Sequence, residues 1–278
     1  MNGPQARIYK KEIAEYYTRR SHAYDDIAWH DRMARALVEH AGIRSDARVL
    51  DIGTGTGMVA MHAASKLGPR GSLVGIDISE GMVDIARSNM PDAPIRNMHF
   101  VLGDGEALPF PPDSFDLILC GSAFIWMTDL HATLLHWKSR LKAHGRVGFH
   151  AFSEHAFIAG VVAQKVLLKH GITFLMNKPT GSVEKCRKLL ERAGFGNIEI
   201  IEDCNGAYIG LEEAKQGWAR LLCPAPGQYP HPLARLTSEQ MVSAQVDYEQ
   251  ELERLNTDSG IWNDMTTFHV FGGKQPHP

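Results

Sequence analysis

Short apolar runs of strand length alternate with helix-compatible stretches through much of the chain, and this alternation restricts the fold more than any other feature. The runs lie at 48–52, 72–76, 98–102, 115–120 and 146–152. Between them, 58–66, 80–89 and 130–141 have helical character, and Gly145 is a plausible C-cap of the last. Such alternation is typical of βαβ units. It predicts an α/β fold with a parallel sheet and helices on both faces.

The remaining segments do not follow this alternation of strands and helices. Two helices are expected within 5–41, 156–170 is a long apolar-rich helix candidate, and Thr237 begins a capping box of the type Thr-Ser-Glu-Gln. A helix over 183–193, ended by Gly194, should lead into a further strand at 197–202. We therefore expect four parts: N-terminal helices or lid (1–45), a ligand-binding core (46–205) with a helical insertion near 156–180, a helical cap insertion (206–263), and a final strand with a tail (264–278).

Composition argues against several partners and compartments. A net charge of -3, from 29 basic and 32 acidic residues, gives no positive field for a phosphate backbone, so no nucleic acid partner is expected. The 4 cysteines lie far apart, unlike the close pairs of zinc or thioredoxin-like sites. No apolar span of about 20 residues or signal-peptide core appears, so we expect no membrane span and a cytoplasmic location. Self-association into a homo-oligomer is left open.

The most informative motif is Val-Leu-Asp-Ile-Gly-Thr-Gly-Thr-Gly at 49–57, where a buried strand runs into a glycine-rich turn and then a helix. Glycines let the backbone turn tightly and let a ligand approach the helix N-terminus without meeting a Cβ atom. Dinucleotide-binding proteins have such a turn too, but their pattern requires a third glycine where Met58 stands. The Gly-Lys-Ser/Thr ending of a Walker A loop is also missing.

Acidic residues follow the next two strands. Asp77 ends the second strand about 20 residues beyond the glycines, where a carboxylate can accept both hydroxyls of a ribose. Asp104 ends the third strand at the same sheet edge and could accept an adenine amino group. With Asp51 they make the site electronegative, which is unfavourable for pyrophosphate and favourable for a cation. S-adenosylmethionine carries a sulfonium and an ammonium group, so the charges and the glycine spacing indicate the same ligand.

These motifs, with Asp-Gly-Glu-Ala-Leu-Pro-Phe at 104–110 and Leu-Leu-Glu-Arg-Ala-Gly-Phe at 189–195, resemble those of class I S-adenosylmethionine-dependent methyltransferases over roughly 16–202. Within that superfamily the chain is most similar to the ubiquinone/menaquinone-biosynthesis type, the methyltransferase type 11-like branch, whose members methylate small molecules. The resemblance implies a Rossmann-like seven-stranded sheet of order 3-2-1-4-5-7-6, with the last strand antiparallel.

The resemblance also assigns a cofactor site. It implies that the first-strand motif holds the methionine end, Asp77 the ribose, and Asp104 with Gly105 the adenine, while two N-terminal tyrosines resemble those that close over the cofactor. Phe124, Trp126 and Met127 are either core or pocket lining. The candidate cofactor-binding residues are Tyr17, Tyr24, Asp51, Gly53, Thr54, Gly55, Gly57, Asp77, Ile78, Met82, Asp104, Gly105, Cys120, Gly121 and Ser122.

Methyl transfer from a sulfonium is a direct displacement, so the protein has to align the reactants and exclude water. Residues 120–123 read Cys-Gly-Ser-Ala, which is neither the Asn/Asp-Pro-Pro-Tyr/Phe turn of nucleobase-methylating enzymes nor the acidic site of magnesium-dependent catechol enzymes. We therefore expect no metal. A catalytically silent subunit, or a non-methylating cyclisation catalyst of the same fold, remains the alternative.

The acceptor is expected to be a small, largely hydrophobic molecule methylated on O, N or C. We expect its pocket to form from the N-terminal helices, 156–170 and 206–263 at the ligand edge of the sheet. The alternative is that the apolar residues of these three pieces pack against one another within the cap and line no pocket. His155, just after the fifth strand, is the candidate general base, with His150 and His131 as rivals. Apolar residues suggesting a hydrophobic acceptor are Phe157, Val161, Val162, Tyr208, Trp218, Leu221 and Trp262.

Overall fold

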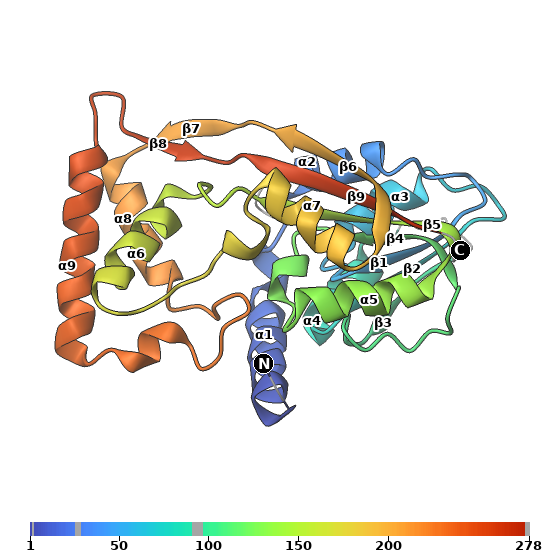
Figure 1. Cartoon of the computed structure of the whole chain (residues 1–278), viewed down its shortest axis with the longest axis horizontal. Helices are drawn as coiled ribbons and strands as arrows, with labels where there is room; N and C mark the ends of the chain where they lie inside the picture. The colour runs from blue at the N-terminus through green and yellow to red at the C-terminus, as the bar shows by residue number, and fades with distance from the viewer. Residues whose placement is uncertain (2, 26–28, 91–96, 276–278) are drawn as a thin grey trace.

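The computed structural model describes residues 1, 3–25, 29–90 and 97–275. Its main sheet has the order β3-β2-β1-β4-β5-β9-β6 (Figure 1), so the expected order is confirmed, with β9 as the seventh strand. Strands β1 to β5 run parallel, whereas β9 is antiparallel to both of its neighbours. The strands are β1 Arg48–Ile52, β2 Ser72–Asp77, β3 Met98–Leu102, β4 Phe115–Cys120, β5 Leu141–Phe152, β6 Phe195–Asp203 and β9 Thr267–Lys274.

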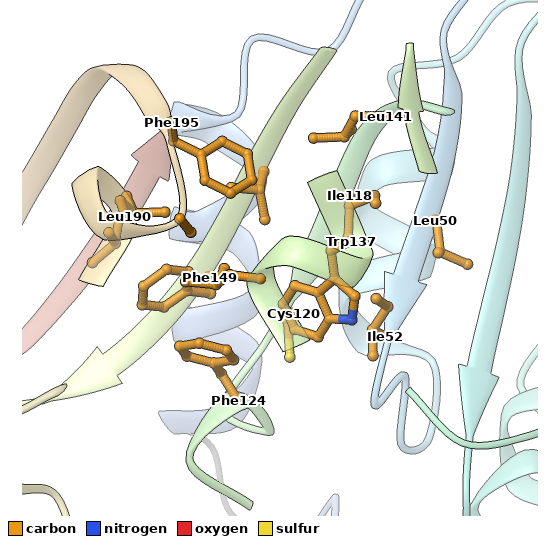
Figure 2. Close-up of a cluster of buried hydrophobic side chains, with 14 of the residues drawn as sticks. Leu50, Ile52, Ile118, Cys120, Phe124, Trp137, Leu141, Phe149, Leu190 and Phe195 are labelled. Carbon is orange, nitrogen blue, oxygen red and sulfur yellow. The ribbon is translucent and has the colours of Figure 1, made fainter. Parts of the chain in front are cut away.

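The central strands are mostly apolar, with Asp51 as a buried exception in β1, because both faces of the sheet are covered. On one face, Leu50 and Ile52 of β1 join a core with α5 (Leu130–Arg140) and α7 (Val183–Arg192). Figure 2 shows this core, in which Trp137 of α5 lies among side chains of β1, β4 and β5. On the other face, Val49 joins a core with α2 (Trp29–His40), α3 (Met58–Ala64) and α4 (Glu80–Ser88). The alternating sequence therefore builds a three-layer α/β core.

Two helix ends differ in how well the sequence predicted them. Helix α7 ends before Gly194, whose φ of 73° suits the expected C-cap. The expected C-cap at Gly145 was wrong, because α5 ends at Arg140 and β5 begins at once with Leu141. Leu141 is buried and pairs with Phe115 of β4, so the strand begins at Leu141 rather than at Arg146, where the sequence predicted its start.

A helical cap stands at one end of the sheet (Figure 1). Its helices α6 (Ile158–Lys169), α8 (Leu211–Arg220) and α9 (Ser238–Leu255) pack around a third apolar cluster that contains Val162, Trp218 and Leu221. The capping box at Thr237 is present as predicted. Within the described ranges, no helix is both long and apolar enough to cross a bilayer.

The segment predicted as a helical cap insertion, 206–263, also contains strands. Strands β7 (Gly206–Ile209) and β8 (Ile261–Asp264) form an antiparallel ribbon that joins the cap to β6 and β9. Tyr208 and Trp262 lie on this ribbon as an exposed edge-to-face pair, with ring centroids 5.3 Å apart. Because these two side chains pair on the surface and Trp218 packs inside the cap, none of the three lines the cavities described below.

Candidate active site

Two adjoining cavities lie at the carboxyl ends of the parallel strands. The first holds about 730 Å³ of open space and is covered by α1 (Gly3–Arg20), and the second holds about 450 Å³. They share Tyr24, Gly53, Gly55, Gly121 and Ser122. The first cavity is lined by Tyr9, Lys10, Ile13, Tyr17, Tyr24, Ile52, Gly53, Gly55, Ile76, Asp77, Ile78, Met82, Asp104, Gly105, Glu106, Gly121, Ser122, Ala123, Trp126 and Met127. The second is lined by Tyr24, His30, Met33, Ala34, Gly53, Thr54, Gly55, Thr56, Met58, Val59, Gly121, Ser122 and His150.

The glycine turn after β1 forms the floor between the two cavities. Gly53 has a φ of 64°, and a Cβ atom there would collide with Ala123 of the β4 loop. Gly55 has a φ of 55° and meets no side chain, so a substituent there would project into the cavities. Gly57 lines neither cavity and packs against Phe100 instead. The turn therefore leaves room for a ligand at Gly55 in particular.

Asp77 is fixed in place by backbone donors. Gly55 N donates to its Oδ2 at 2.9 Å, and Ser79 N donates to its Oδ1 at 2.9 Å. Burial raises the pKa of Asp77, and the N–H groups of Ser79, Gly55 and Ile78 oppose that rise by stabilising the carboxylate. A carboxylate held in this way still has lone pairs free to accept ligand hydroxyls from the first cavity.

Asp104 meets a cation that sequence reasoning missed. Lys10 Nζ of α1 lies 2.7 Å from Asp104 Oδ2 and 2.8 Å from Glu106 Oε2. Burial lowers the pKa of Lys10, but hydrogen bonds to the two carboxylates outweigh it, so the net shift is upward. Gly105 between them accepts a hydrogen bond at 2.7 Å from Trp137 Nε1. The first cavity is thus lined by one lysine and by the three carboxylates of Asp77, Asp104 and Glu106, so its wall remains electronegative.

Two predicted contact residues lie behind the walls. Asp51 is fully buried beneath the glycine turn, where its Oδ2 accepts a hydrogen bond from Thr54 Oγ1 at 2.6 Å. Burial raises the pKa of Asp51 to about 7, which the Thr54 bond partly opposes. Cys120 is likewise buried and lines neither cavity. Thr54 itself lines the second cavity, so Asp51 acts on the site by holding the turn.

The N-terminal helix contributes more than its two predicted tyrosines. Tyr9 and Ile13 line the first cavity with Tyr17, one helical turn apart, and that spacing was the available signal. Tyr9 Oη donates to Trp126 O at 3.1 Å and accepts from Gly227 N at 2.8 Å. Trp126 also lines the cavity, so it is a pocket residue rather than a core residue. Its ring packs edge-to-face on that of Tyr17, with centroids 5.7 Å apart. Helix α1 is thereby attached to the β4 loop and to the cap.

The structure does not bring the candidate base to the site. His155 is exposed and lines neither cavity, because the chain turns away after β5 and Glu154 N bonds Gly181 O at 2.9 Å. His131 Nε2 lies 3.2 Å from Arg192 O and connects α5 to α7. Of the three candidates only His150 lies at the site, since it lines the second cavity, together with His30, and its Nδ1 is 2.9 Å from Ser122 Oγ.

Comparison with known proteins adds independent information. A family model described as a methyltransferase domain matches residues 49–145. Aklanonic acid methyltransferase DauC of Streptomyces sp. (strain C5) is 34% identical over 225 residues, covering 77% of this chain and 100% of that protein. The ubiquinone/menaquinone biosynthesis C-methyltransferase UbiE of Pseudomonas putida is 32% identical over 151 residues, which are 52% of this chain and 59% of the relative. The YcgJ protein from Bacillus subtilis shares the fold, with a TM-score of 0.58, 20% identity and coverage of 88% of this chain and 99% of that chain.

The two cavities suit S-adenosylmethionine as a ligand. Gly55 leaves the backbone open to it, and Asp77 and Asp104 present carboxylates that can accept hydrogen bonds from its hydroxyl and amino groups. The electronegative wall suits the ligand's sulfonium and ammonium charges. With a relative matched over its whole length, this agreement of site and sequence means that the chain belongs to the class I S-adenosylmethionine-dependent methyltransferases.

Proposed function

We propose that this protein transfers the methyl group of S-adenosylmethionine to a small, largely hydrophobic organic acceptor of the secondary-metabolite or quinone-precursor kind, releasing S-adenosylhomocysteine. The observation that carries the proposal is the convergence of the glycine turn, Asp77 and Asp104 on one cavity that has tyrosine and tryptophan rings in its wall. The names of the two curated relatives, for aklanonic acid and for ubiquinone/menaquinone biosynthesis, support an acceptor with apolar rings.

In this proposal each end of the cofactor has its own residues. Asp77 accepts the ribose hydroxyls, with Ile78 and Met82 beside it, and Asp104 accepts the adenine amino group. When bound, S-adenosylmethionine supplies an electrophilic methyl group on its sulfonium. The turn at Gly53 and the β4 loop set the direction in which that group faces, and α1 excludes water from above.

The acceptor is proposed to bind on the aromatic side of the site. Phe152 at the end of β5 packs edge-to-face on Trp29, with centroids 5.6 Å apart, and on Phe157, 4.7 Å apart. These three rings line neither cavity themselves and lie behind the wall of the second, where Trp29 contacts His30 and Phe152 contacts His150. The rings that do line the first cavity are those of Tyr9, Tyr17, Tyr24 and Trp126, and such aromatic walls bind flat apolar rings by dispersion and edge-to-face contacts. Since His155 lies elsewhere, alignment and desolvation are the protein's main contributions, and an acidic hydroxyl or carbon acid is the favoured acceptor group.

A two-stage experiment tests the proposal. Calorimetric titration should show binding of S-adenosylmethionine and S-adenosylhomocysteine and none of NADH. A panel of phenolic, quinol and aromatic carboxylic acceptors is then screened for S-adenosylhomocysteine release, with mass spectrometry of the products. A product 14 Da heavier than one of the acceptors is expected, the mass of one added methylene. Cofactor binding without methylation of any acceptor in the panel would instead favour the silent or non-methylating alternative.

A further inference from the structure

Ser122 and His150 form a buried polar pair at the junction of the two cavities. Ser122 lies just after β4, lines both cavities, and has a φ of 58°, a left-handed conformation that is unfavourable for serine. His150 of β5 is 2% exposed, and its Nδ1 lies 2.9 Å from Ser122 Oγ. Its Nε2 is buried, with no hydrogen-bond partner among the described residues. A strained serine aimed at a ligand site and fixed by a buried imidazole indicates a function.

The surroundings of His150 determine which way the hydrogen bond runs. Burial, followed by the neighbouring His269 of β9 and His30 of α2, holds the pKa of His150 well below its usual range, so the ring is neutral at neutral pH. A proton on Nε2 would leave a buried N–H without an acceptor, whereas a proton on Nδ1 is used by Ser122 Oγ. The ring therefore donates to Ser122. The hydroxyl hydrogen of Ser122 is left free to point into the cavities.

The second cavity differs from the first in charge. The first has Asp77, Asp104 and Glu106 in its wall, whereas no carboxylate occurs among the described residues that line the second. Asp51 lies sealed beneath the turn, and Asp25 is bonded to Thr56 Oγ1 outside the lining. The polar side chains of the second cavity are instead two imidazoles and the hydroxyls of Tyr24, Thr54, Thr56 and Ser122, of which Thr54 and Thr56 already donate to Asp51 and Asp25.

S-adenosylmethionine has one anionic group, the carboxylate of its methionine end. The acidic wall of the first cavity would repel that group, whereas in the second cavity it could accept hydrogen bonds. We infer that the second cavity receives this carboxylate and that the Ser122 hydroxyl, oriented by His150, donates a hydrogen bond to it. Ser122 is then a ligand-binding residue and His150 a positioning residue. The inference rests on the proposed function, because it concerns the same cofactor.

The test compares two ligands that differ only at this end. S-adenosylhomocysteine has the aminocarboxylate, and 5′-methylthioadenosine has the same nucleoside and sulfur without it. In calorimetric titrations, Ser122→Ala is expected to weaken S-adenosylhomocysteine binding about 10- to 100-fold, the effect of losing a hydrogen bond to a charged group. Binding of 5′-methylthioadenosine should stay within about twofold. Ser122→Gly, which suits the left-handed backbone, should give the same pattern without strain.

Two substitutions of His150 separate positioning from packing. His150→Asn places an amide near the position of Nδ1 and should keep the affinity for S-adenosylhomocysteine within about threefold of wild type. His150→Gln places its amide near Nε2 and should weaken binding as Ser122→Ala does, with no further loss in the double variant. Equal weakening of both ligands in the Ser122 variants, or of neither, would overturn the inference. Failure of the wild type to bind either ligand would instead overturn the proposed function.

Discussion

Three aspartates at neighbouring strand ends differ in role because their immediate surroundings differ. Asp51 is sealed under the turn with Thr54, Asp77 is held by backbone N–H groups at the cavity wall, and Asp104 is paired with Lys10. Only the last two face the first cavity. A carboxylate whose oxygens are fixed by the backbone keeps its direction without side-chain rearrangement, so Asp77 is the most rigid polar contact available to a ribose.

Replacing Asp77 with alanine should weaken S-adenosylhomocysteine binding by about 1 to 3 kcal/mol, since two ribose hydroxyls then lose a buried partner. The measurement is the dissociation constant from calorimetry, together with urea unfolding to show that the variant is folded. Asp84→Ala removes an exposed carboxylate of α4 that pairs with Arg87, and it should leave the affinity unchanged. Unaltered affinity in a folded Asp77→Ala protein would remove Asp77 from the site.

At the scale of elements, the N-terminal helix decides the charge of the first cavity. Lys10 is the cation that lines this cavity among the described residues, and it neutralises part of the field of Asp77, Asp104 and Glu106. The helix is held by Tyr9, which bonds both the β4 loop and the cap. Because Tyr9 anchors the helix separately, the charge of Lys10 can be changed while α1 stays attached.

Lys10→Met should shift the cofactor preference toward the cationic form. S-adenosylmethionine bears a sulfonium that S-adenosylhomocysteine lacks, so a more negative wall should raise the ratio of their affinities about two- to fivefold at low salt. The gain should shrink at high ionic strength because salt screens the field. The matched control is Lys11→Met on the exposed face of α1, where the lysine meets Glu15. A ratio that stays constant or falls would show that Lys10 does not set this preference.

Some of these elements could be predicted from the sequence, and others could not. The five parallel strands and the glycine turn follow from local patterns, since each strand is an apolar run, whereas the order of the strands was implied by the resemblance to the family. The inward face of α1 does not follow from such patterns, because Ile8 is exposed while Tyr9 is buried against Trp126 and Gly227. The position of His150 relative to His155 likewise depends on how β5 pairs and where the chain turns, which are non-local properties.

At the scale of the whole molecule, buried histidines on β5 and β9 make the stability of the fold depend on pH. His150 and His269 are register partners on these antiparallel strands, with ring centroids 5.7 Å apart, and both are almost fully buried. Burial, with His40 nearby, lowers the pKa of His269 to about 4, and burial holds that of His150 well below its usual range. Charging either ring inside the sheet is unfavourable, whereas both titrate freely in the unfolded chain at about 6.5.

The unfolded chain therefore binds more protons than the folded one below about pH 6.5, and stability falls as the pH drops from there toward 4. At pH 7 and above this contribution is fully present, and His269 alone should account for about 3 kcal/mol of the loss by pH 4. Urea unfolding followed by tryptophan fluorescence at pH 7.5, 6, 5 and 4.5 measures it. His269→Phe should flatten the decline relative to wild type, while His99→Gln, at an exposed position of β3, should not. Carboxylates titrate alike in all three proteins, so parallel curves for wild type and His269→Phe would show that His269 binds its proton equally well in the folded and the unfolded protein.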